Sequence, residues 1–210
     1  MRLSRRPSVV SGDGPSLASS SRLMVDTAML LVRVVGATTA DVPELDEQVG
    51  DIARSTDRLG EEVTDRLVGD LVLPFERGDL HRVLSAQRVV VRTLLRVSRT
   101  LLADRSAPTH HSVVHAADEV LRAAELVGVA TGALRATGRL ADIARETARV
   151  REDLEASLQR AVRTASTSAT TDRSPAAAPH VVLAALADAV AGCADVVVDM
   201  RILAAGAGRR

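Results

Sequence analysis

The residues best suited to binding a metal ion lie in one short histidine-rich stretch. His111 and His115 are four residues apart, and Asp118 follows three residues later. On a helix, imidazoles at this spacing share one face and can grip one zinc or copper ion. No ligand on a partner helix can be identified from the sequence, and a solvated helix start after Pro108 explains the same residues. We therefore treat these three residues as weak metal candidates and expect no cofactor.

The side chains that could act in catalysis are few. Cys193 is the only cysteine, so one chain can form neither a disulfide nor a cysteine-based zinc site. It lies on an apolar helical stripe, where a buried and inert thiol is expected rather than a nucleophile. The sequence contains no G-x-S-x-G elbow, no P-loop and no strand-linked G-x-G-x-x-G motif. These observations indicate a protein that is not an enzyme.

The composition favours helices packed closely on one another. Hydrophobic residues make up 46% of the 210 residues, yet there is one Phe and neither Trp nor Tyr, so Ala, Val and Leu must form the core. The 27 basic residues, all arginines, are balanced by 27 acidic ones, which gives no global attraction to nucleic acid or membranes. Asp188 and Asp195 interrupt the longest apolar stretch, so we expect no membrane insertion. A cytoplasmic protein is expected.

Hydrophobic residues that recur every three or four positions predict six amphipathic helices and no strand. The first 20 residues are rich in Ser, Gly and Pro and are expected to form a disordered tail. The predicted fold class is therefore all-α, a six-helix bundle. The expected helices cover residues 22–36, 43–73, 79–103, 109–135, 140–164 and 179–205.

Two segments in the second and fifth predicted helices are similar to each other. Residues 51–63 align without gaps with residues 142–154, and seven positions are identical. Convergence is an alternative in a chain rich in Ala, Arg and Val, but a duplicated three-helix unit is the favoured interpretation. We predict one bundle domain over residues 21–206, with repeat one at about 21–105 and repeat two at about 108–206.

Residues 73–80, with the sequence L-P-F-E-R-G-D-L, separate the second and third predicted helices. Pro74 cannot continue a helix. Gly78 loosens the backbone, and Asp79 can accept hydrogen bonds from the free N–H groups of the next helix. The segment therefore predicts a helical hairpin. Thr109 is predicted to cap the fourth helix in the same way.

With this layout, the chain resembles the PhoU-like family, specifically the single-chain phosphate-transport regulators associated with Pit-type phosphate transporters. The family's turn of the form T-P-[FI]-D-R-E-D-I is matched here by the signature residues Pro74, Phe75, Arg77 and Asp79. Residues 186–196 also look like the family's C-terminal L-E-D-A-x-D-R-C-E-D-V. The resemblance implies a six-helix bundle made of two three-helix repeats.

The resemblance also implies a function, that of a non-enzymatic regulator or accessory protein of phosphate transport. Such a protein would act by protein–protein contact with a Pit-type transporter, and it would meet the inner face of the membrane only through that partner. A homodimer is also compatible with the sequence. Two alternatives stay open, because a fold does not determine a function. One is a structural or oligomerisation bundle without a phosphate role, and the other is a bundle that binds metal through the histidine cluster.

Many members of this family bind metal through E-x-x-x-D pairs on their inner helices, since carboxylates four residues apart share one helical face. Most of the matching positions in this chain carry no carboxylate. Counted from Pro74, the first pair falls at Ala53 and Asp57. The other positions fall at Ala144 and Ala148, at Arg88, Val89 and Arg92, and at Ala187 and Ala191. We expect the family's metal site to be lost, and only Asp57 and Glu61 are left there as weak metal candidates.

Arginines replace carboxylates on the third predicted helix. Arg88, Arg92 and Arg96 are spaced four apart, so like charges stack on one face and need anions or water nearby. We hypothesise that Asp57 or Glu61 pairs with Arg88 or Arg92 across the second and third helices and so substitutes for the metal. The alternative is that these arginines are simply solvated, because exposed ion pairs contribute little.

Overall fold

The computed structural model describes residues 14–69, 75–103, 110–168 and 179–207, and these residues form six α-helices, one short 3-10 turn and no strand. The predicted all-α fold with six helices is therefore confirmed. The elements are α1 (Gly14–Gly36), η1 (Thr39–Asp41), α2 (Val42–Gly69), α3 (Arg77–Ala103), α4 (His111–Gly132), α5 (Thr137–Ser168) and α6 (Pro179–Ala207).

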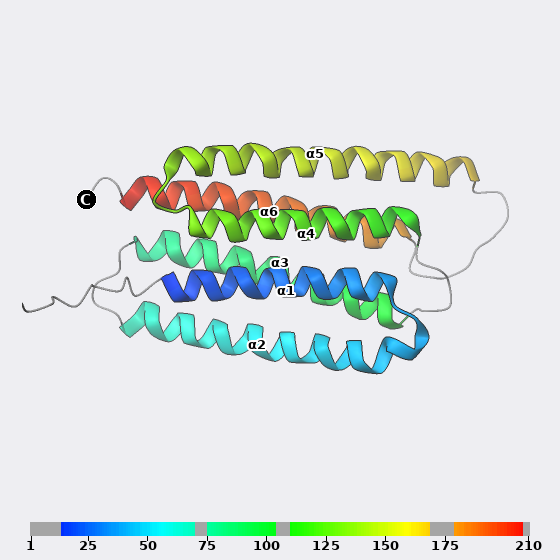
Figure 1. Ribbon diagram of the computed structural model, residues 1–210, viewed down its shortest axis with the longest axis horizontal. Coiled ribbons are helices and arrows are strands. Elements are labelled where there is room, and N and C mark those ends of the chain that lie inside the picture. The colour runs from blue at the N-terminus through cyan, green and yellow to red at the C-terminus, as the bar shows by residue number, and fades with distance from the viewer. Residues whose placement is uncertain (1–13, 70–74, 104–109, 169–178, 208–210) are drawn as a thin grey trace, which may run out of the picture.

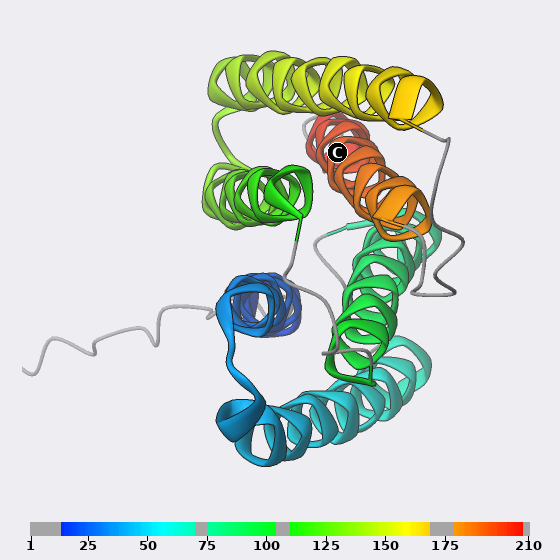
Figure 2. The same ribbon diagram turned by 90° about the vertical axis from the view of Figure 1, so that its right-hand side faces the viewer.

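The six helices are arranged as two similar groups of three (Figure 1). Helices α1, α2 and α3 contact one another, and so do α4, α5 and α6. The two groups meet through the α1–α4 and α3–α6 contacts, which leaves α2 and α5 at opposite ends of the cross-section (Figure 2). This arrangement has the symmetry that a duplicated three-helix unit would have. The duplication itself and the exact repeat boundaries stay predictions.

The aligned segments of α2 and α5 have the same local structure. Thr56 and Thr147 are both buried, and each hydroxyl donates a 2.8 Å hydrogen bond to the carbonyl of the residue four positions earlier. This bond satisfies a hydroxyl that would otherwise be buried without a partner. The Arg54–Asp51 ion pair is likewise matched by an Arg145–Asp142 pair. The sequence similarity therefore extends to side-chain contacts.

The start of the first helix corrects the predicted tail. Helix α1 begins at Gly14, so residues 14–20 are helical, whereas we expected the disordered tail to extend to residue 20. Leu17 is fully buried, and Ser20 and Ser21 are buried beside it. The apolar stripe of α1 continues back from Met24 to Leu17 at helical spacing, but the Ser-rich composition concealed it.

Two predicted helix caps are also different in the structure. Helix α3 begins at Arg77, so Asp79 lies inside the first turn, where it pairs with Arg82 at 3.7 Å. A carboxylate is still favourable there, because it faces the positive end of the helix dipole. Thr109 lies outside the described residues, and His110 is the N-cap of α4, its ring nitrogen accepting a 3.3 Å hydrogen bond from the Ser112 N–H.

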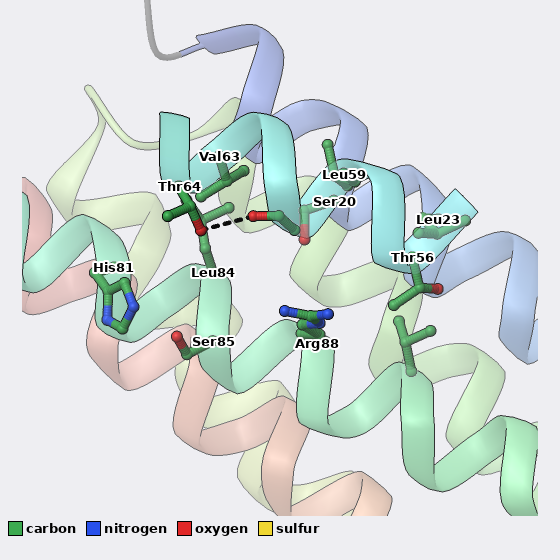
Figure 3. Close-up of a pocket in the computed structure, with 12 residues that line it drawn as sticks. Ser20, Leu23, Thr56, Leu59, Val63, Thr64, His81, Leu84, Ser85 and Arg88 are labelled. Atoms are coloured by element: carbon green, nitrogen blue, oxygen red, sulfur yellow. Dashed lines mark hydrogen bonds between the residues drawn. The ribbon is translucent and has the colours of Figure 1, made fainter. Parts of the chain in front are cut away.

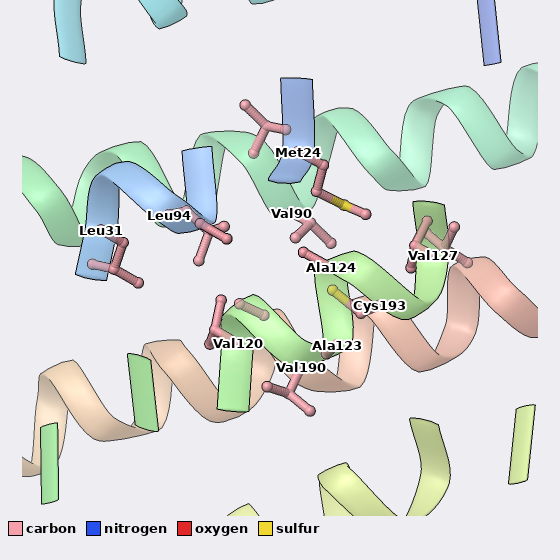
Figure 4. Packing of buried hydrophobic residues seen from close by; sticks show 14 of the residues in the cluster. Met24, Leu31, Val90, Leu94, Val120, Ala123, Ala124, Val127, Val190 and Cys193 are labelled. Atoms are coloured by element: carbon pink, nitrogen blue, oxygen red, sulfur yellow. The ribbon is translucent and has the colours of Figure 1, made fainter. Parts of the chain in front are cut away.

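Helix α6 lies at the centre of the second group and contacts α3, α4 and α5. Its inward side chains, such as Cys193, are buried in the hydrophobic core together with residues of α3 and α4 (Figure 4). Gly192 allows the close approach of α3, because a Cβ atom at that position would lie 2.8 Å from Val90 Cγ2. The buried face consists of Val182, Leu183, Leu186, Ala189, Val190, Cys193, Val196, Val197, Met200, Leu203 and Ala204.

Within the described residues, α6 is also the one helix long and apolar enough to cross a membrane. Within His180–Ala207, a window of 18 residues reaches a mean hydropathy of 2.2, although we expected Asp188 and Asp195 to exclude this helix by composition. A helix that packs on several neighbours in a bundle core is apolar because most of its surface is removed from water, and the same holds for a membrane span. Contacts with three other helices therefore account for the composition of α6.

A polar side chain interrupts the hydrophobic core where α1, α3 and α4 meet. Gln87 is fully buried, and its amide nitrogen donates a 2.8 Å hydrogen bond to Ser21 Oγ, which shares a 2.6 Å bond with Thr131 Oγ1. The Gln87 Oε1 atom has no hydrogen-bond partner in the described part of the chain. A buried carbonyl oxygen left in this state costs about 1–3 kcal/mol.

Replacing Gln87 with leucine should therefore stabilise the protein. The Q87L variant removes the unsatisfied oxygen and loses one hydrogen bond, while Ser21 keeps its bond to Thr131. We expect the free energy of unfolding, measured by urea denaturation, to rise by about 1 kcal/mol. The control Q48L, at a partly exposed position of α2, should change it by less than about 0.5 kcal/mol. A clear loss of stability in Q87L would show that Oε1 is satisfied in solution.

Candidate functional site

The ion pair predicted between α2 and α3 is present in the structure. Asp57 Oδ1 accepts one hydrogen bond from Arg88 Nη2 and one from Arg92 Nη2, each 3.1 Å long. The two arginines are one turn apart on α3, so both can reach a single carboxylate on the neighbouring helix. Glu61, the alternative partner, is exposed and makes no ion pair with any described residue. Whether the Asp57 pair substitutes for a metal stays a hypothesis.

The charges of this cluster do not cancel. Two guanidinium groups share one carboxylate oxygen, and Arg96 adds a further positive charge one turn along the exposed face of α3. The hydrogen bonds from Arg92 and then Arg88 lower the pKa of Asp57 below its ordinary value of 3.8. The carboxylate of Asp57 is therefore ionised at neutral pH, and the cluster still has an excess of positive charge.

This pKa shift predicts a pH-dependent effect of removing the Asp57 carboxylate. A carboxyl group with a lowered pKa stabilises the folded state above its ordinary pKa, and this contribution is lost as the pH falls through the lower, folded-state value. We expect D57N to melt at a lower temperature than the parent protein at pH 7. The difference should stay constant down to about pH 5 and shrink below the ordinary pKa of 3.8. Circular dichroism melts across this range test the prediction, and a difference that grows on acidification would contradict it.

Gly60 determines where the Arg88 side chain lies. A Cβ atom at residue 60 would be only 2.7 Å from Arg88 Nη1 and 2.8 Å from its central carbon. Real Cβ atoms do not approach other atoms so closely, so any larger residue would displace the guanidinium group. The glycine therefore lets Arg88 lie flat against α2 while it also contacts Asp57.

A small cavity lies beside Arg88, between α1, α2 and α3, with a volume of about 70 Å³ (Figure 3). Leucine and valine side chains form part of its wall. The Nε atom of Arg88 is buried and has no hydrogen-bond partner among the described residues. The polar side chains that line it are Ser20, Thr56, Thr64, His81, Ser85 and Arg88.

Only part of this site is evident from the sequence. Asp57, Arg88 and Arg92 were predicted to belong together, but Gly60, Ser20 and Ser85 were missed. Helical spacing gives a signal for two of these, because Gly60 is three residues from Asp57 and Ser85 is three residues from Arg88. Ser20 gave no such signal, since it fell in the predicted tail.

The residues of the site do not fit a metal centre. Guanidinium groups repel cations, and alanines at the other expected ligand positions offer no donor atoms. Among the described residues, no group of three or more His, Cys, Asp or Glu side chains is placed to hold a metal ion. This covers the histidine candidates as well, of which His111 and Asp118 are exposed and His115 is half-buried.

The signature residues lie at the end of the bundle where α3 begins. Pro74 lies outside the described residues. Phe75 is half-buried and packs against the hydrophobic core, where it lines a groove formed mainly by α1 and α4. Arg77 is exposed at the first position of α3, and Asp79 follows within the first turn. The single aromatic residue of the chain therefore anchors the start of α3 to the core.

Comparison with solved structures identifies the fold. Two PhoU-like proteins from Shewanella oneidensis MR-1, one of them described as a putative PhoU-like phosphate regulatory protein, match this chain with TM-scores of 0.71 and 0.70. In both cases the match covers 95% of this chain and 100% of the other, at 18% and 19% sequence identity. No family model and no curated protein matches the sequence. The chain has the PhoU-like fold, which confirms the resemblance at the level of structure.

Proposed function

We propose that this protein is a non-enzymatic regulator of phosphate transport that binds the cytoplasmic side of a Pit-type transporter. The supporting observation is that the fold matches two PhoU-like proteins over 95% of this chain and the whole length of each of those proteins, one of which is described as a putative PhoU-like phosphate regulatory protein. The match includes both three-helix groups, so it extends over the whole helical architecture and not over one hairpin. It therefore supports a shared mode of action more strongly than a match to one helical hairpin would.

The absence of enzymatic activity is part of this proposal. The Cys193 thiol is fully buried, and burial raises its pKa to about 12, so it is a poor nucleophile at neutral pH. The charged cluster of Asp57, Arg88 and Arg92 contains no thiol, and the one histidine that lines the cavity beside it, His81, is exposed. Contact with a partner protein is the role that such a bundle supports best.

Co-purification from detergent-solubilised membranes tests the proposed partner. A tagged full-length chain should retain a Pit-type transporter. Deletion of the gene that encodes this chain should change the rate at which cells take up phosphate. In cells that lack the transporter, the chain should move from the membrane fraction to the soluble fraction. A stable homodimer that retains no transporter, together with unchanged uptake, would contradict the proposal and favour a structural or oligomerisation role.

A further inference from the structure

The cavity between α1, α2 and α3 combines positive charge with unused hydrogen-bonding groups. Arg88 contributes a guanidinium group whose Nε atom is buried without a partner in the described part of the chain. Arg88 and Arg92 share one carboxylate, so Asp57 compensates only one of their two positive charges. A buried donor on a charged group is costly unless an acceptor reaches it, and an anion is the strongest acceptor.

The hydroxyl groups around Arg88 are placed to complete an anion site. Ser20, on α1, and Ser85, on α3, line the cavity, and neither side chain makes a hydrogen bond to another described residue. Thr64 donates its hydroxyl proton to the Gly60 carbonyl at 2.8 Å, which leaves its oxygen free to accept (Figure 3). The wall thus offers donors for anionic oxygens and an acceptor for a protonated one.

The size of the cavity suits a small ligand. A single water molecule needs about 10–15 Å³ of such space, so the volume of about 70 Å³ accommodates a group the size of several waters. A tetrahedral ion with four oxygens is of this size. Leu59 and Val63 contribute apolar wall beside the guanidinium group, whose side chain is 37% exposed, and an apolar neighbourhood strengthens the attraction between this group and an anion.

We propose that this cavity binds a small tetrahedral oxyanion, with inorganic phosphate as the ligand to be tested. The Arg88 guanidinium provides the charge and points into the cavity, while the Ser20 hydroxyl binds from α1 and the Ser85 hydroxyl binds from α3 (Figure 3). Gly60 makes the site possible because it leaves space for the guanidinium group. This inference goes beyond the proposed transporter contact and does not depend on it.

Isothermal titration of the full-length protein in phosphate-free buffer tests the site. Inorganic phosphate should bind with one-to-one stoichiometry, and R88Q should weaken the affinity by at least about tenfold, because hydrogen bonds to charged groups are among the strongest. The matched control is R96Q, which makes the same change of charge on the same helix outside the cavity. Its affinity should stay within about threefold of the parent value, since salt screens exposed charges.

Further measurements keep the test decisive if R88Q is poorly folded. S85A removes one hydroxyl from the wall and should weaken phosphate binding by about two- to tenfold. G60A displaces the guanidinium group without removing its charge and should weaken binding as strongly as R88Q. If sulfate displaces phosphate at equal concentration, the site accepts tetrahedral oxyanions in general, whereas no displacement identifies phosphate as the preferred ligand.

Three results would overturn the proposal. They are no detectable phosphate binding to the parent protein, unchanged binding in R88Q, and equal losses in R88Q and R96Q. The last would show that net charge, and not the cavity, attracts the anion. Because the co-purification experiment measures the transporter contact without added phosphate, failure of one idea leaves the other separately testable.

Discussion

Replacing Leu186 with alanine is expected to lower the free energy of unfolding by about 2–5 kcal/mol. Leu186 is fully buried on α6, the helix that contacts α3, α4 and α5, so its removal leaves a cavity that several helices would have to move to fill. For a chain of this size, each 1 kcal/mol lowers the melting temperature by about 2–4 °C. Urea denaturation of L186A followed by circular dichroism measures the loss.

The control for this prediction is I202A on the same helix. Ile202 has a side chain of similar size, but it is 46% exposed, so its truncation should cost much less than that of Leu186. Equal losses for the two variants would mean that α6 is buried on both faces, as it would be in a membrane or in a tight oligomer. A large difference would establish that α6 presents one face to the core and one to solvent.

Enlarging Gly192 to valine is the second substitution with a large expected effect. A Cβ atom there would already lie 2.8 Å from Val90 Cγ2, and Val90 has little rotational freedom because β-branched side chains are stiff in helices. Helices α3 and α6 would have to separate, and overpacking of this kind costs about 1–3 kcal/mol. We expect G192V to lose at least this much stability in urea denaturation.

Two companion variants test the cause of that loss. Gly206 lies on the same helix, and a Cβ atom added there would meet no atom within 4 Å, so G206V should be nearly neutral. Combining G192V with V90A removes the methyl group that collides and should recover part of the stability. If V90A brings no recovery, the contact between the two residues is not what limits the approach of α3 to α6.

The sequence predicted the helices well because apolar residues recur at helical spacing along most of the chain. It also predicted the Asp57 ion pair. Counting from Pro74 placed Asp57 on α2 and Arg88 and Arg92 on α3 at similar distances from the turn, so that they lie side by side on the two helices. Both predictions depend on spacing along one helix and on the order of two neighbouring helices. Such information is local and can be taken from a single sequence.

The features that the sequence did not predict depend on contacts between helices. Ser20 lines a cavity whose other walls come from α2 and α3. The role of Gly60 follows from the Arg88 guanidinium group, which lies against it from α3.

The cap predicted at Asp79 failed for a local reason. The Leu80 N–H already bonds to the Glu76 carbonyl at 3.0 Å, so the backbone turns into α3 before Asp79 is reached.

The contacts between the two three-helix groups have a consequence for how the sequences of the two halves can diverge in evolution. Because α1 packs on α4 and α3 packs on α6, the chain resembles a dimer whose protomers have been joined into one polypeptide. A true dimer with identical subunits must carry every surface feature twice. Joined halves are free to differ, and here Asp57 in one aligns with Ala148 in the other. The covalent link thus permits an asymmetric molecule, with the Asp57 carboxylate on one half and an alanine at the aligned position of the other.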